Sequence, residues 1–373
     1  DRYGFKKSNQ YISKAEYDAW NTNYTQYIER RRKKWYALMR AYGLMTDDPI
    51  RFPPKSEKVK RYVRKGIPPE WRGAAWFWYA GGPGRLARMQ GVYWELVRRC
   101  EKPEDEGGLN DADREHIERD LHRTFPDNIS FKPDPPTTPL SSPESSPESW
   151  PDPPDPPILN SLRRVLRAFA LHNPQIGYCQ SLNFIAGLLL LFLKSDEEKA
   201  FILLDVITSV HLPGTHARVL EANVDIGVLM DLLREHLPAV WNRIDDGDPA
   251  DLNPAPGKRG APGLGPAQPR LPTVSLATTP WFMSLFIGTL PIESTLRVWD
   301  SLFYEGSKTL FRVSLAIFKL GEPSIRAIED PMEVFQVVQT LPRKMLDVNM
   351  LMEACWKRKG FGSVNQELID ERR

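Results

Sequence analysis

The sequence predicts an all-α fold. Apolar residues recur at helical spacing in several segments, whereas no stretch shows the sustained period-two alternation or the Asn-Gly turn of a β-hairpin. Hydrophobic residues make up 41% of the 373 positions and charged residues 26%, which is typical of a globular protein. A chain of this length can form two helical lobes, each with its own core.

The first 55 residues are expected to form an N-terminal helical extension. Ser13 and Glu16 have the spacing of a capping box, which starts a helix. Large apolar side chains follow at helical spacing, namely Tyr17, Trp20, Tyr24, Tyr27, Ile28, Trp35 and Leu38. The basic run Arg30–Lys34 lies inside this helix and is expected to be a solvated face. Contact with an anionic membrane or an acidic partner is the alternative.

Residues 56–373 are expected to form the main domain, with two flexible insertions. Residues 133–157 contain eleven prolines, and each proline lacks the backbone N–H that a packed element needs. Residues 246–272 are also rich in Pro and Gly and are expected to be a surface loop.

Other segments are predicted to be helices of the core. One apolar stripe consists of Ile158, Leu162, Val165, Leu166 and Phe169. Residues 182–193 are nearly all apolar but too few to cross a bilayer, so we expect a buried helix.

Local signals predict where three further helices begin. Ser195 with Glu198 has the spacing of a capping box, and Thr279 with Pro280 is typical of an N-cap followed by the first helical residue. Pro291 is expected to open the next helix in the same way.

Charge and cysteine content narrow the class of protein. The 50 basic and 48 acidic residues nearly cancel, which argues against a nucleic-acid-binding protein. Cys100, Cys179 and Cys355 are far apart and have no metal-ligand spacing, so they fit free thiols of the cytosol. The chain starts at Asp1 without a charged and apolar leader, and we expect a fragment of a longer cytoplasmic protein.

No motif of a self-contained hydrolase or of a dinucleotide site is present. Three other segments stand out. The first, Arg64–Trp76 (RKGIPPEWRGAAW), combines a Gly-Ile-Pro turn with bulky apolar residues, and we expect a structural role for it.

The second segment is Ile117–Pro126 (IERDLHRTFP). Asp120 and Arg123 are three residues apart, so the carboxylate can hold the guanidinium on one helix face. Pro126 ends the helix and leaves Arg123 near the terminus, free to project. A surface ion pair is the plainer interpretation of such a pair.

The third segment is Tyr178–Gly187 (YCQSLNFIAG). Gln180 and Asn183 are polar residues at the start of an apolar helix, where helix capping is the structural explanation. Cys179 has no base that the sequence pairs with it, so we expect a structural thiol.

Together and in this order, the three segments resemble the signature motifs of TBC domains, the Rab GTPase-activating domains. They match the patterns R-x-G-I-P-x-x-x-R, I-x-x-D-x-x-R and Y-x-Q-x-x-N, and the likeness runs from about residue 56 to about residue 350. The third motif often reads Y-C-Q-G-M-N, whereas this chain has Ser181 and Leu182. The opening DRYGF suggests the fungal subgroup that acts on exocytic and endosomal Rabs.

The resemblance implies a two-lobed TBC domain that acts on a Rab-family small GTPase. By matching position, Arg123 would be an arginine finger and Gln180 a glutamine finger inserted into the Rab site. Asp120 would orient Arg123, and Tyr178 and Asn183 would set the helix start that presents Gln180. GTP and Mg²⁺ would belong to the Rab, so this chain would need no cofactor.

Two alternatives stay open. A member of the family that has lost catalysis would bind a Rab as a scaffold, although this chain keeps both candidate fingers. A helical adaptor would instead associate peripherally with vesicle or plasma membranes through Arg30–Lys34.

Overall fold

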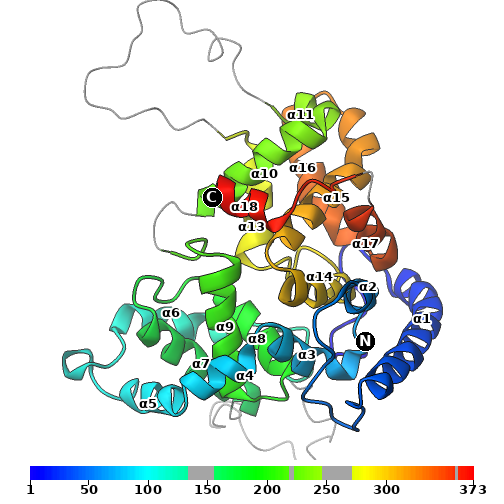
Figure 1. Ribbon diagram of the computed structural model, residues 1–373. Coiled ribbons are helices and arrows are strands. Elements are labelled where there is room, and N and C mark those ends of the chain that lie inside the picture. Colours follow the sequence, from blue (N-terminus) through cyan, green and yellow to red (C-terminus); the bar gives the residue numbers. More distant parts are fainter. Residues whose placement is uncertain (133–154, 218–221, 246–270, 358–359) are drawn as a thin grey trace, which may run out of the picture. The chain divides into compact units, whose positions relative to one another are not determined.

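The computed structural model describes residues 1–132, 155–217, 222–245, 271–357 and 360–373. Over these ranges the chain is built of helices joined by loops (Figure 1). The β-structure among the described residues is one antiparallel bridge, between Phe5 and Asn128. The predicted all-α class is therefore confirmed.

The chain folds into two compact units. The first contains Asp1–Thr22 and Glu70–Ile207, and the second contains Asn23–Pro69 and Thr208–Arg373. Both units draw on residues 1–55, so this division differs from the expected boundary at residue 56, which stays a prediction. The central parts of both predicted insertions lie outside the described residues.

Helix α7 (Pro157–His172) is the centre of the first unit. Its predicted stripe is buried, and α5, α6, α8 and α9 pack around it. The helices of this unit are α3 (Arg72–Tyr79), α4 (Gly82–Arg88), α5 (Val92–Arg99), α6 (Asp111–Leu121), α7, α8 (Leu182–Phe192) and α9 (Glu197–Val206). Helix α8 is the buried helix that the sequence predicted. No helix of the described ranges is long and apolar enough to cross a membrane.

The start of α9 differs from the prediction. Asp196, not Ser195, is the N-cap, and its carboxylate accepts a hydrogen bond from the Lys199 amide at 3.0 Å. Ser195 has a φ of 62° and lies in the turn before the cap. The helix therefore begins one residue later than the capping-box spacing indicated.

Helix α15 (Lys308–Arg326) is the centre of the second unit, where α10, α11, α14, α16 and α17 pack against it. The helices that lie wholly in this unit are α2 (Glu57–Arg64), α10 (Ala222–His236), α11 (Pro238–Ile244), α13 (Val274–Met283), α14 (Ile292–Glu305), α15, α16 (Pro331–Thr340), α17 (Val348–Trp356) and α18 (Gln366–Arg372). Helix α14 begins directly after Pro291, as predicted.

The predicted helix start at Thr279 is wrong. Pro280 lies inside α13, which already begins at Val274. The Thr279 hydroxyl donates to the Ser275 carbonyl at 3.0 Å, one turn back, as a threonine inside a helix does.

Helix α1 (Lys14–Ala41) starts with the predicted capping box. The Glu16 amide donates to the Ser13 hydroxyl at 3.2 Å, and the Glu16 carboxylate accepts from the Ser13 amide at 2.7 Å. The basic run is not one solvated face, because Arg31 is buried and donates to the Tyr62 carbonyl at 3.0 Å. Neighbouring Arg30, Lys33 and Lys34 are exposed.

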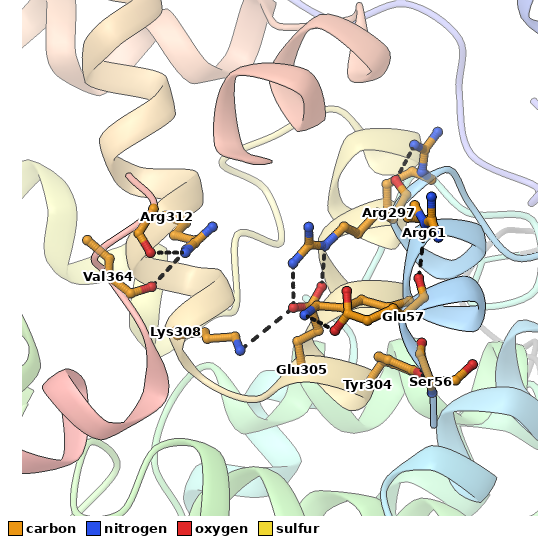
Figure 2. Close-up of polar contacts among 12 residues, drawn as sticks. Ser56, Glu57, Arg61, Arg297, Tyr304, Glu305, Lys308, Arg312 and Val364 are labelled. Atoms are coloured by element: carbon orange, nitrogen blue, oxygen red, sulfur yellow. Dashed lines mark hydrogen bonds and ion pairs between the residues drawn. The ribbon is translucent and has the colours of Figure 1, made fainter. Parts of the chain in front are cut away.

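Buried polar contacts in the second unit hold the first part of the Arg64–Trp76 motif. Arg64 donates two hydrogen bonds to Glu305, at 2.6 and 2.7 Å, and the buried Arg297 donates to the Arg64 carbonyl at 2.7 Å. Lys308 lies 3.7 Å from the same Glu305 carboxylate, and Figure 2 shows the two residues joined by a dashed line. These contacts fit the structural role expected for the motif.

Candidate functional site

Arg123 lies two residues beyond the end of α6. Its amide donates to the Asp120 carbonyl at 3.2 Å in the turn that follows the helix, and the chain then leaves the helix direction at Phe125, which has a left-handed φ of 48°, and at Pro126. The side chain is 65% exposed. Its Nη1 is 3.7 Å from Asp120 Oδ1, an ion-pair distance that is too long for a hydrogen bond. The guanidinium is therefore available to a partner.

Asp120 and Tyr178 connect the second and third motifs. Asp120 is buried at the end of α6, and its Oδ2 accepts a hydrogen bond from the Tyr178 hydroxyl at 2.9 Å. Burial raises the pKa of Tyr178, and the nearby Asp120 carboxylate raises it further. The phenol therefore stays protonated and donates to Asp120 across the neutral pH range.

Gln180 lies in the loop between Tyr178 and α8. Its side chain is exposed, so Gln180 is not the buried cap of the structural explanation. The next residue, Ser181, has a φ of 106°, where a side chain is strained. The Ser181 amide donates to the Asn183 side chain at 3.2 Å, so Asn183 stabilises the turn that presents Gln180.

A chain of hydrogen bonds joins this turn to the Arg123 loop. The buried Asn183 amide group donates to the Thr124 hydroxyl at 2.9 Å, and that hydroxyl donates to the Asp120 carbonyl at 3.0 Å. Thr124 is a functional candidate that the sequence reasoning missed. Its position directly after Arg123 was the available signal.

The two loops also share apolar packing. The Phe125 ring lies 5.5 Å from Phe184, which is on the first turn of α8, in an edge-to-face arrangement. Gly187 allows this approach, because a Cβ there would lie 3.0 Å from the Thr124 methyl group and 3.2 Å from the Phe125 ring. Arg123 and Gln180 are therefore held by neighbours that contact each other.

Cys179 lies between Tyr178 and Gln180 but is a poor nucleophile. Burial raises the pKa of its thiol, which disfavours the reactive thiolate. In the described part of the chain, no group of three or more His, Cys, Asp or Glu side chains is placed to hold a metal ion.

The predicted site residues thus fall into two kinds. Asp120 and Asn183 are buried, Tyr178 is half-buried, and all three form hydrogen bonds between the two loops. Arg123 and Gln180 are exposed, so these two loops present one cation and one amide to the solvent. Such a pair can bind the anionic oxygens of a partner and hold a water molecule.

Comparisons of the sequence with a family model and with known proteins identify relatives in one protein family. The sequence model of the Rab-GTPase-TBC domain matches residues 143–254 and 271–325. The GTPase-activating protein GYP3 of Saccharomyces cerevisiae is 45% identical over 99% of this chain, which spans 62% of the length of GYP3. The GTPase-activating protein MSB4 of the same yeast is 41% identical, with 100% of this chain and 80% of MSB4 covered.

A solved structure also matches the fold. The Chlamydomonas flagellar RabGAP TBC domain superimposes with a TM-score of 0.68 at 26% identity, with 96% of this chain and 99% of that chain covered.

Proposed function

Because this chain belongs to the Rab-GTPase-TBC domain family, we propose that it activates GTP hydrolysis by a Rab-family small GTPase. The two yeast relatives are both named GTPase-activating proteins, and they support this activity. The observation that carries the proposal is the exposure of Arg123 and Gln180 on two loops whose buried neighbours are hydrogen-bonded to each other.

Arg123 would enter the nucleotide site of the Rab. Negative charge on the transferred phosphoryl group increases in the transition state, and an arginine inserted by an activating protein speeds hydrolysis by about 10³–10⁵. The planar guanidinium can donate to two oxygens at once, which an ammonium cannot do in the same geometry. Asp120, 3.7 Å from Arg123, would limit the directions in which the side chain points.

Gln180 would hold the attacking water. A side-chain amide can accept from the water and donate to a phosphate oxygen, so that the water lies in line with the bond that breaks. The strained Ser181 and the Asn183 side chain fix the backbone next to Gln180, which reduces the freedom of the amide. GTP and Mg²⁺ would be carried by the Rab, and this chain would supply side chains alone.

The test is single-turnover hydrolysis by a panel of GTP-loaded Rabs, each in its normal form and with its own catalytic glutamine changed to leucine. If Gln180 replaces that glutamine, this chain still stimulates the Gln→Leu Rab. Gln180→Ala then abolishes stimulation of both forms. Gln175→Ala is the matched control, because Gln175 is an exposed glutamine five residues earlier in the same segment.

The outcomes separate catalysis from binding. A chain that binds GTP-loaded Rabs but stimulates none of them is a scaffold and contradicts the proposal. If the Gln180→Ala variant stimulates the Gln→Leu Rab as strongly as the wild-type chain does, the chain is still an activator but Gln180 takes no part in hydrolysis.

A further inference from the structure

Residues Tyr3–Lys6, here called the N-terminal segment, lie against the loop that carries Arg123. Phe5 forms the antiparallel bridge with Asn128. The Lys6 amide donates to the Asp127 carbonyl at 3.1 Å, and the Ile129 amide donates to the Gly4 carbonyl at 3.1 Å. These bonds join two stretches of backbone that are more than 100 residues apart in the sequence.

Gly4 allows this close contact. Its φ is +87°, and a Cβ at this position would lie 2.8 Å from Cγ2 of Ile129. A side chain here would therefore be strained and would press on the Arg123 loop. The Asn128 side chain adds a third link, because its amide donates to the Tyr3 carbonyl at 3.0 Å.

Phe5 packs directly on the strained residue of the loop. Its ring lies 5.3 Å from that of Phe125, at an interplanar angle of 84°. Phe125, two residues after Arg123, holds a left-handed φ that persists only when its surroundings stabilise it. Phe5 and Phe184 of α8 both contact this ring.

The other end of the N-terminal segment is fixed to a buried arginine. Arg72, the last residue of the R-x-G-I-P-x-x-x-R motif, is 1% exposed and donates to the Tyr3 hydroxyl at 2.7 Å. The Tyr3 ring also lies 5.3 Å from Phe192 at the end of α8. The segment is thus attached to rigid elements on one side and to the Arg123 loop on the other.

We infer that the N-terminal segment is a positioning element for Arg123. It holds the backbone of residues 124–129 in the strained conformation that follows α6 and keeps Arg123 directed outward. Without it, Phe125 relaxes toward ordinary backbone angles and the guanidinium loses its position. This inference rests on the proposed function, because its catalytic consequence requires that Arg123 act on a Rab.

Phe5→Ala and Gly4→Ala test the inference in the full chain. A displacement of about 1 Å in a catalytic group can reduce a rate about 100-fold, so we expect stimulated single-turnover hydrolysis to fall ten- to hundred-fold with each variant. Phe77→Ala is the control, because Phe77 is a buried aromatic residue of the same unit whose ring lies against Gly82 and Lys199. It is expected to lower the melting temperature without a comparable loss of turnover per folded molecule.

A double-mutant cycle shows whether the effect passes through Arg123. In an Arg123→Ala background, Phe5→Ala is expected to cause no further loss, because the group that it positions is already absent. Amide hydrogen exchange supplies a reading that does not depend on activity: the Ile129 amide, bonded to Gly4 in the wild type, is expected to exchange at least tenfold faster in both variants.

The inference is overturned if Phe5→Ala keeps wild-type turnover, or if it lowers turnover equally with and without Arg123. Unchanged exchange at Ile129 also overturns it. If Phe5→Ala does not fold, Gly4→Ala and the milder Phe5→Leu carry the same comparisons. Absence of stimulation by the wild-type chain with every Rab would contradict the proposed function, while the exchange result would still decide whether the segment holds the loop.

Discussion

Two residues beside the proposed fingers hold backbone angles that favour glycine. Phe125 has a φ of 48° and follows Arg123 by two positions, while Ser181 has a φ of 106° and directly follows Gln180. Strained residues of this kind cost about 1–3 kcal/mol each and persist where the surrounding structure fixes them. Both lie in the loops that carry the proposed fingers, so the contacts around Phe125 and Ser181 must hold these two loops in place.

Ser181→Gly is expected to raise the free energy of unfolding by about 0.5–1 kcal/mol. Glycine removes the strain energy that a side chain causes at a φ of 106°. This gain is expected to exceed the free-energy cost of the extra conformational entropy that glycine gives the unfolded chain. Ser181→Ala is the control, since it removes the hydroxyl but keeps the Cβ. Chemical denaturation of the three proteins measures the order, and an alanine variant as stable as the glycine variant would show that the backbone at residue 181 is not strained.

Arg123→Lys is expected to keep the fold and lose most of the stimulated hydrolysis, about 100-fold or more. An ammonium keeps the charge but lacks the planar pair of donors that bridges two phosphate oxygens. Arg98→Lys is the matched control, because Arg98 is 71% exposed on α5 and pairs with Glu95. Single-turnover rates at matched melting temperatures test this prediction, and near wild-type turnover by Arg123→Lys would show that Arg123 is not the finger.

At the scale of elements, the periodicity of apolar residues predicted the helices more reliably than the capping residues predicted where helices begin. The predictions of α7 from its apolar stripe and of α8 from its apolar run were correct. Burial of one helix face, or of a whole helix, requires apolar residues at many positions, so the pattern is strong. Single residues mark the ends. Thr279-Pro280 looked like a helix start, yet α13 tolerates Pro280 within the helix.

The candidate site was predictable in part. The residues Arg123 and Gln180 came from a pattern of motifs, and the structure adds that both are exposed. Thr124 and Phe5 were missed because their roles depend on contacts between residues far apart in the sequence, such as the Asn183–Thr124 hydrogen bond. No local pattern reports such a contact, and none predicts the positive φ of Phe125.

The link between α6 and the loop before α8 leads to a prediction for Tyr178→Phe. This change removes the hydrogen bond to the buried Asp120 and is expected to lower stability by about 1–3 kcal/mol. We also expect turnover per folded molecule to fall at least fivefold, because Asp120 and the Gln180 loop lose their shared contact.

Tyr93→Phe is the control for this change. Tyr93 is buried in the same unit and donates to the Glu197 carboxylate at 2.6 Å, so its loss removes the same kind of bond away from the two loops. Denaturation and single-turnover assays on both proteins decide. Equal losses of turnover would mean that Tyr178 contributes stability alone.

At the scale of the whole molecule, the candidate site belongs to one compact unit. Asp120, Arg123, Tyr178, Gln180 and Asn183 all lie within Glu70–Ile207, and the N-terminal segment belongs to the same unit. The predicted insertion at 133–157 lies in the sequence between the arginine and glutamine motifs. Its last residues are part of the fold, because Asp155 accepts a hydrogen bond from Arg163 at 2.7 Å and Pro157 is the first residue of α7.

This boundary gives the last prediction. Residues 133–154 carry nine of the eleven prolines, so a Gly/Ser linker of equal length in their place is expected to leave the melting temperature within about 2 °C of the wild type. Extending the replacement through Pro157 removes the Asp155–Arg163 contact and the prolines at the start of α7, and is expected to lower stability by about 1–2 kcal/mol.

Thermal melting of both replacements tests the boundary, and the Rab panel tests the function of the segment. A large drop in melting temperature with the shorter replacement would show that residues 133–154 pack against the domain. Unchanged stability with a changed choice of Rab would instead assign the segment a role in partner selection.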